Sequence, residues 1–116
     1  MGIAQAHGSA GEAVAVAYLR LSGCEVLEQN TRLADVEVDV LARDGNAAVV
    51  VEVKLRARTD YGGPALAVSR IQRERLVRAA RWLAHHHAGP VRIDLIAIAL
   101  HAEGMSVRHY RSAITE

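Results

Sequence analysis

The fold is decided by residues 36–54, which have the sequence VEVDVLARDGNAAVVVEVK. Valine dominates the arms on either side of its centre, residues 36–43 and 47–55, and the branched valine side chain packs well on a pleated sheet. Between the arms lies Asp44-Gly45-Asn46, a combination that favours a tight turn. The stretch therefore predicts two antiparallel strands joined as a β-hairpin.

The register of this hairpin decides whether its acidic side chains meet. A two-residue loop at Asp44-Gly45 would place Glu37 opposite Glu52, with Asp39 diagonal to it. A loop that is two residues longer, or shifted by one at each side, would place Asp39 opposite Glu52 and Glu37 opposite Lys54. Both registers gather these four side chains on one face, with the intervening valines on the other. A three-residue loop would separate them.

The rest of the chain predicts helices before and after this hairpin and two further strands. The first helix begins with a capping-box pattern, Ser9 with Glu12, and ends at Gly23. The second begins with the same pattern, Ser69 with Gln72, and ends at Gly89-Pro90. The remaining predicted elements are a helix over 9–21, a strand over 25–28, a loop over 56–64, a helix over 69–87, a strand over 91–100 and a strand over 106–110. This order predicts an α/β domain spanning residues 1–116, with a mixed sheet of about five strands flanked by helices.

Composition excludes several protein classes. Hydrophobic residues make up 51% and charged residues 23%, as in ordinary globular domains, and a net charge of +1 indicates no particular partner. Cys24 is the only cysteine, which excludes a disulfide framework and a cysteine-rich zinc site. No signal peptide is evident and the apolar runs are short, so we expect a cytoplasmic protein that does not engage a membrane.

The clustered carboxylates of the hairpin point to a cation. Like charges facing each other destabilise a sheet, and Mg²⁺ is commonly held by one or two carboxylates together with water and phosphate oxygens. Lys54 is the only lysine among fourteen Lys and Arg residues, and its ammonium group could orient a water or stabilise a phosphate. The alternative is a solvated charged face, although valines on both faces of the second strand argue against it.

Two polar residues lie on the apolar faces of the predicted helices, close to their starts. Glu12 precedes Val16 by four residues and is a candidate metal ligand, while Gln72 precedes Leu76 by four and is a candidate catalytic group. Each could instead serve only its capping box.

Arginines crowd the region after the hairpin and could bind nucleic-acid phosphates. An ordinary solvated helix face is an equally good explanation of those on the second helix. The candidate nucleic-acid-binding residues are Arg56, Arg58, Arg70, Arg73, Arg78 and Arg81.

These segments together resemble the uncharacterised YraN protein family, over nearly the whole chain from Gly11 to about Leu100. That family is similar to archaeal Holliday-junction resolvases within the restriction-endonuclease-like nucleases, whose motif is an acid on one strand and acid-x-Lys on the next. The matching segments are Gly11-Glu12, Asn30-Thr31-Arg32, Glu37-Val38-Asp39, Val51-Glu52-Val53-Lys54, Tyr61-Gly62-Gly63-Pro64 and Arg92-Ile93-Asp94.

The resemblance implies a restriction-endonuclease-like fold and a metal-dependent endonuclease that hydrolyses phosphodiester bonds in DNA, including structured or branched DNA. It implies metal ligands at Asp39 and Glu52, a helix acid at Glu12, a catalytic Lys54, Mg²⁺ or Mn²⁺ as cofactor, and a homodimer. The chain departs from the family pattern where Gln72 replaces a common lysine and where a valine replaces a glycine before Glu-x-Asp. The alternative function is a non-catalytic nucleic-acid-binding module that retains the fold.

Overall fold

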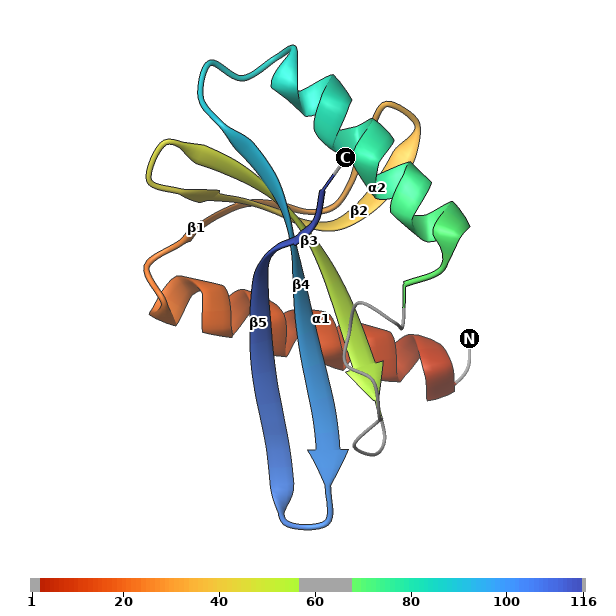
Figure 1. Ribbon diagram of the computed structural model, residues 1–116. Helices are drawn as coiled ribbons and strands as arrows, with labels where there is room; N and C mark the ends of the chain where they lie inside the picture. Colours follow the sequence, from red (N-terminus) through yellow and green to blue (C-terminus); the bar gives the residue numbers. More distant parts are fainter. Residues whose placement is uncertain (1–2, 57–67, 116) are drawn as a thin grey trace.

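The computed structural model describes residues 3–56 and 68–115, with side chains from Ala10 onward in the first helix. It confirms the α/β class and the predicted order of elements (Figure 1). None of the described helices is long and apolar enough to cross a membrane. The elements are α1 (Ile3–Leu21), β1 (Glu25–Leu33), β2 (Val36–Asp44), β3 (Ala47–Arg56), α2 (Arg70–Ala84), β4 (Val91–His101) and β5 (Gly104–Ile114).

The five strands form one sheet in the order β1-β2-β3-β4-β5. Neighbouring strands are antiparallel except β3 and β4, which are parallel and are joined through α2. Figure 1 shows α2 and α1 lying on the two sides of this sheet. A parallel pair needs a crossover connection, and here the crossover helix brings its own side chains over β3.

The core has two layers, one on each face of the sheet. Leu76, Ala79 and Leu83 of α2 pack with Val50 and Leu95 in what we call the α2-side cluster. The α1-side cluster contains Ala15, Val16 and Leu19 of α1 and the strand residues Val40, Val49, Val51, Ile96 and Ile98. The central strands are therefore covered on both faces, and the near-continuous apolar run of β4 is typical of a strand buried in this way.

The hairpin between β2 and β3 adopts the shifted register. Asp44 pairs with Ala47 across a Gly45-Asn46 loop, and Gly45 has φ +62°, which glycine adopts without steric cost. The ladder of paired positions continues to Val40 and Val51. In this register the next two positions are those of Asp39 and Glu52.

Two details of the helices differ from prediction. Helix α1 begins at Ile3, so Ser9 lies inside it and does not cap it. Ala4, Gln5 and Ala6 explain this, because alanine and glutamine are good helix formers and the helix continues back through them. Ser69 does cap α2, since its Oγ accepts a hydrogen bond from the Gln72 amide at 3.1 Å, but the Gln72 side chain turns elsewhere.

The two outer strands are longer than predicted. β1 continues to Leu33 through a largely exposed polar segment, and β5 spans Gly104–Ile114. Backbone pairing with β2 and β4 holds these segments, and their exposed side chains carry no alternating hydrophobic pattern to reveal them. Most of the predicted loop over 56–64 lies outside the described residues, and Arg56 is the last residue of β3.

Candidate active site

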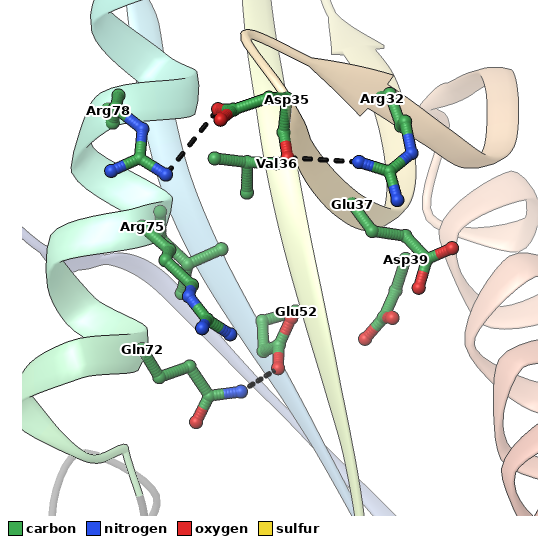
Figure 2. A pocket seen from close by; sticks show the side chains of 10 residues that line it. Arg32, Asp35, Val36, Glu37, Asp39, Glu52, Gln72, Arg75 and Arg78 are labelled. Carbon is green, nitrogen blue, oxygen red and sulfur yellow. Dashed lines mark hydrogen bonds and ion pairs between the residues drawn. The ribbon is translucent and has the colours of Figure 1, made fainter.

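A pocket of about 480 Å³ opens between α2, the ends of β2 and β3, and the turn between β1 and β2 (Figure 2). Arg75 and Arg78 of α2 face the acidic residues of β2 and β3 across it, and Arg32 lies on the β2 side beside Glu37. A further acidic residue, Asp35, lies on the turn. The lining residues are Arg32, Asp35, Val36, Glu37, Asp39, Glu52, Gln72, Arg75, Leu76 and Arg78.

Glu52 lies at the inner end of this pocket and is only 9% exposed. β3 presents it to the α2 side of the sheet, where its Oε2 accepts a hydrogen bond from Gln72 Nε2. The pKa of Glu52 is raised from 4.5 to about 7, first because the side chain is buried and second because of the negative charge of Asp39, while Lys54 partly offsets both effects. The site thus holds a carboxyl group whose charge is incompletely compensated by the protein.

Asp39 is held by the main chain of the neighbouring strand. Its Oδ2 accepts a hydrogen bond from the Val53 amide at 2.9 Å, and its side chain is half-buried. This bond lies beyond the last paired position of the β2–β3 ladder, so the carboxylate occupies a place where a strand carbonyl would otherwise accept. Asp39 is therefore fixed beside Glu52.

Gln72 connects the carboxylate of Glu52 to the ammonium group of Lys54. Lys54 Nζ donates to Gln72 Oε1 at 2.8 Å and lies 3.6 Å from Glu52 Oε2. The cap at Ser69 sets the start of α2, and this places Gln72 over β3. The Gln72 side chain therefore contacts Glu52 and Lys54 and does not form the predicted capping box.

The predicted alternation along β2 is wrong at one point. Val36 and Val38 belong to the α2-side cluster, whereas Val40 belongs to the α1-side cluster, so these valines do not share a face. The change occurs opposite Asn30 of β1, which has φ 51° and falls between the pairs Gln29–Val40 and Thr31–Val38. Glu37, although exposed, nevertheless lines the same pocket as Asp39.

Glu12 lies half-buried on α1, across the sheet from α2. The adjacent Gly11 packs against Leu55, because a Cβ at Gly11 would lie 3.5 Å from the Leu55 Cβ. This turn of α1 thus approaches β3 one residue beyond Lys54, but Glu12 does not line the described pocket.

Asp39 and Glu52 form a donor set that fits a hard divalent cation. Both supply oxygen, both face a pocket, and the raised pKa of Glu52 marks uncompensated negative charge. Within residues 3–56 and 68–115 no group of three His, Cys, Asp or Glu side chains is close enough to hold a metal by itself. A cation here would depend on water or phosphate oxygens for its remaining ligands, as Mg²⁺ commonly does.

Of the arginines predicted to bind nucleic acid, only Arg78 lines the pocket among those that the structure describes. Arg70 instead pairs with Glu74 at 3.4 Å on the outer side of α2. Arg58 lies outside the described residues, and Arg56, Arg73 and Arg81 do not line the pocket.

Two pocket arginines, Arg32 and Arg75, were missing from the predicted set. The helical spacing of Arg75, three residues after Gln72 and three before Arg78, could have revealed it. Arg32 of β1 has no such spacing, but it lies in the family segment Asn30-Thr31-Arg32, and that segment could have revealed it.

A second buried acid lies on the α1 side of the sheet. Asp94 of β4 is fully buried and accepts hydrogen bonds from Arg92 Nε at 3.0 Å, His109 Nε2 at 2.7 Å and the Ser112 amide at 3.0 Å. His109 Nδ1 in turn lies 3.0 Å from the Tyr18 hydroxyl, which links α1 to the network. The carboxylate has a full set of partners, so this network is structural.

The chain is similar to proteins from several bacteria along most of its length. A UPF0102 protein of Beutenbergia cavernae is 47% identical over 110 residues, covering 91% of this chain and 93% of the relative. A relative from Parafrankia sp. is 38% identical over 117 residues, covering 97% and 99%. A third, from Vibrio cholerae, is 38% identical over 115 residues, covering 95% and 93%.

A distant likeness to a solved structure carries no conclusion about function. The structure of Pyrococcus furiosus SfsA in complex with Ca²⁺ matches at a TM-score of 0.49 and 15% identity, over 97% of this chain and 65% of that one.

The family model for uncharacterised protein family UPF0102 matches residues 11–98, which include Asp39, Glu52, Lys54 and Gln72. The relatives carry the same family name, and this is the family that the sequence motifs indicated under the name YraN. The chain belongs to the uncharacterised protein family UPF0102.

Proposed function

We propose that the protein is a metal-dependent endonuclease that hydrolyses phosphodiester bonds in DNA, with structured or branched DNA among its substrates. The observation that carries the proposal is the convergence of Asp39 and Glu52 on a pocket that Arg75 and Arg78 of α2 also line, with Lys54 Nζ 3.6 Å from Glu52 Oε2. A binding surface alone would not require two clustered carboxylates, because these repel the phosphates of a nucleic acid.

Asp39 and Glu52 would hold the cation, Mg²⁺ or Mn²⁺. The cation supplies Lewis-acid polarisation of a phosphoryl oxygen and lowers the pKa of a bound water. Lys54 is held by Gln72 with its ammonium group facing the carboxylates, so it can donate hydrogen bonds to a water or a phosphate oxygen without first reorganising. Gln72 acts as a positioning residue, since its amide fixes both Glu52 and Lys54.

The proposal is tested by cleavage of labelled duplex, single-stranded and four-way-junction DNA with Mg²⁺, with Mn²⁺ and with a chelator. Cleavage should require metal, and Lys54→Ala should slow it by about 10²-fold to 10³-fold, the usual effect of removing one donor to a developing charge. Asp39→Ala and Glu52→Ala should abolish it. Glu25→Gln is the matched control, because Glu25 is an exposed carboxylate that pairs with Arg43 at the far end of β1.

Metal binding can be followed separately from cleavage. A ligand that binds only the folded state raises the melting temperature, so Mg²⁺ or Mn²⁺ should stabilise the wild type and the Glu25→Gln variant but not Asp39→Ala. Metal-independent cleavage, or cleavage that survives in all three site variants, would contradict the proposal. Salt-sensitive DNA binding without cleavage or metal stabilisation would identify the alternative, a non-catalytic nucleic-acid-binding module.

A further inference from the structure

One flank of α2 combines arginines with exposed apolar side chains. Ile71, Arg75, Arg78 and Trp82 follow the spacing i, i+4, i+7, i+11, which places them on one stripe of the helix. Ile71 is 63% exposed and Trp82 is 38% exposed. We call these four residues the α2 flank; its middle, Arg75 and Arg78, lines the pocket that contains Glu52.

The arginines of the flank are arranged around the turn between β1 and β2. Asp35 of this turn lies 3.4 Å from the Arg78 guanidinium, and its carbonyl accepts a hydrogen bond from Arg32 at 3.0 Å. Figure 2 shows the Arg75 guanidinium pointing from α2 toward Glu52. Three guanidinium groups therefore face one pocket, where Asp35 holds two of them in place, and guanidinium groups suit the geometry of phosphate oxygens.

Arg75 differs from its two neighbours in its pairing. Among the residues that the structure describes, it makes no hydrogen bond or ion pair. Its position between Arg78 and the carboxylates suits a phosphate group adjacent to the one that would be cleaved.

Trp82 adds a planar surface one helical turn beyond Arg78 on the same stripe. Its indole stacks on the His86 imidazole, with ring centroids 4.0 Å apart and planes inclined by 21°. Aromatic side chains of this kind stack with unpaired bases, whereas the bases of a duplex already stack on each other. Phosphate-binding arginines followed by an aromatic ring are the pattern by which proteins bind single strands.

We propose that the α2 flank binds a single-stranded segment of nucleic acid, with Arg32, Arg75 and Arg78 contacting its phosphates and Trp82 stacking on one base. The inference rests on the proposed function for the place of the cleaved bond, and it adds that the strand entering the pocket is unpaired. The single strand at a flap, a gap or a branch point has this chemistry.

The test measures binding in chelator, where cleavage cannot occur. The probes are a fluorescein-labelled oligothymidylate, an abasic oligonucleotide of equal length, and a blunt duplex. Trp82 is the only tryptophan in the chain, so quenching of its fluorescence by the oligothymidylate but not by the abasic strand would report stacking directly. Anisotropy of the label gives Kd for each probe.

Variants at Trp82 and at Arg75 separate the stacking from the phosphate contacts. Trp82→Leu should weaken oligothymidylate binding by at least about fivefold and leave abasic binding unchanged, while Trp82→Phe should restore part of the loss. Arg75→Gln should weaken binding to both single strands and reduce the slope of log K against log salt by about 0.7. Arg108→Gln, which removes an exposed arginine from β5, is the charge-matched control and should change the slope less.

The results separate this inference from the proposed nuclease. Quenching and the variant effects without any metal-dependent cleavage would support the flank and remove the nuclease. Cleavage by a protein whose Trp82→Leu and Arg75→Gln variants bind like wild type would support the nuclease and overturn the flank. Equal affinity for duplex and oligothymidylate without quenching, or no binding in chelator, would also overturn it.

Discussion

Glu52 and Asp94 are buried carboxylic acids on the neighbouring parallel strands β3 and β4, and the sheet places them on opposite faces. Glu52 is 9% exposed and faces the pocket under α2, whereas Asp94 is 0% exposed and lies on the α1 side. A buried carboxylate is costly unless charged or hydrogen-bonded partners compensate it, and the two residues meet this requirement differently.

Asp94 is fully compensated by groups of the protein itself. Arg92 donates from two nitrogens, and His109 and the Ser112 amide complete the set. Glu52 has the neutral Gln72 amide, an ammonium group at 3.6 Å, and a second carboxylate beside it. The comparison teaches that a buried acid is structural when groups of the protein compensate its charge fully. A buried acid beside a pocket whose charge is compensated incompletely marks a place for an external cation.

The largest expected effect is on the structural acid. Asp94→Ala should lower the free energy of unfolding by about 3–5 kcal/mol, because it leaves the Arg92 guanidinium without its buried partner and removes an acceptor from His109. Urea unfolding at low temperature, followed by circular dichroism, measures the change. Asp44→Ala is the control, since Asp44 pairs with the same arginine from a more exposed position and should cost less. Equal losses in the two variants would show that burial does not distinguish these acids.

Replacing Glu52 should change the free energy of unfolding in the opposite direction to replacing Asp94, because it removes a loss of stability instead of causing one. Its folded-state pKa of about 7 lies above 4.5, so the folded protein holds the proton more tightly and the stability it contributes falls as pH rises through this window. Over that window the wild type should lose about 3 kcal/mol relative to Glu52→Gln, which cannot ionise there. Unfolding free energies of both proteins between about pH 4.5 and about pH 8 test this.

Metal should reverse this trend. A cation favours the ionised carboxyl group, so Mg²⁺ or Mn²⁺ should stabilise the wild type most at about pH 8 and have little effect on Glu52→Gln. A pH dependence that is identical in the two proteins would show that Glu52 does not carry the uncompensated charge.

The smallest expected effect comes from changing the partner of Glu52 rather than Glu52 itself. Gln72→Lys introduces a cation within reach of the carboxyl group and should lower the pKa of Glu52 by about one unit, which reduces the pH-dependent loss of stability by about 1.4 kcal/mol. Gln72→Met is the neutral control and should raise that pKa, because the carboxylate loses a donor. The same pH series of unfolding measurements applies, and an unchanged slope in Gln72→Lys would contradict the role given to Gln72.

Much of the fold could be predicted because its signals are local. The valine-rich arms, the Asp44-Gly45-Asn46 turn and the cap at Ser69 each depend on residues close in sequence, and the structure confirms all of them. The start of α1 was wrong because a good capping pattern at Ser9 competes with helix-forming residues before it. β5 was underestimated because strand pairing, not side-chain pattern, extends it.

The candidate site was predicted in part. Asp39, Glu52 and Lys54 follow from strand alternation and register, and the structure brings them together. The arginines did not follow, because a helix has several exposed sides and sequence does not say which side faces a neighbouring turn. Arg75 and Arg78 face the pocket, whereas Arg70 does not.

The sequence by itself determined the elements, the family and the acidic residues of the hairpin, since these depend on local propensity, alternation and motif. Only the tertiary structure decided which of two buried carboxylates has its charge compensated. Gln72 reaches Glu52 from α2, and His109 reaches Asp94 from the neighbouring strand β5. Burial and the sign of nearby charge set a pKa, and both depend on residues brought together from distant parts of the chain.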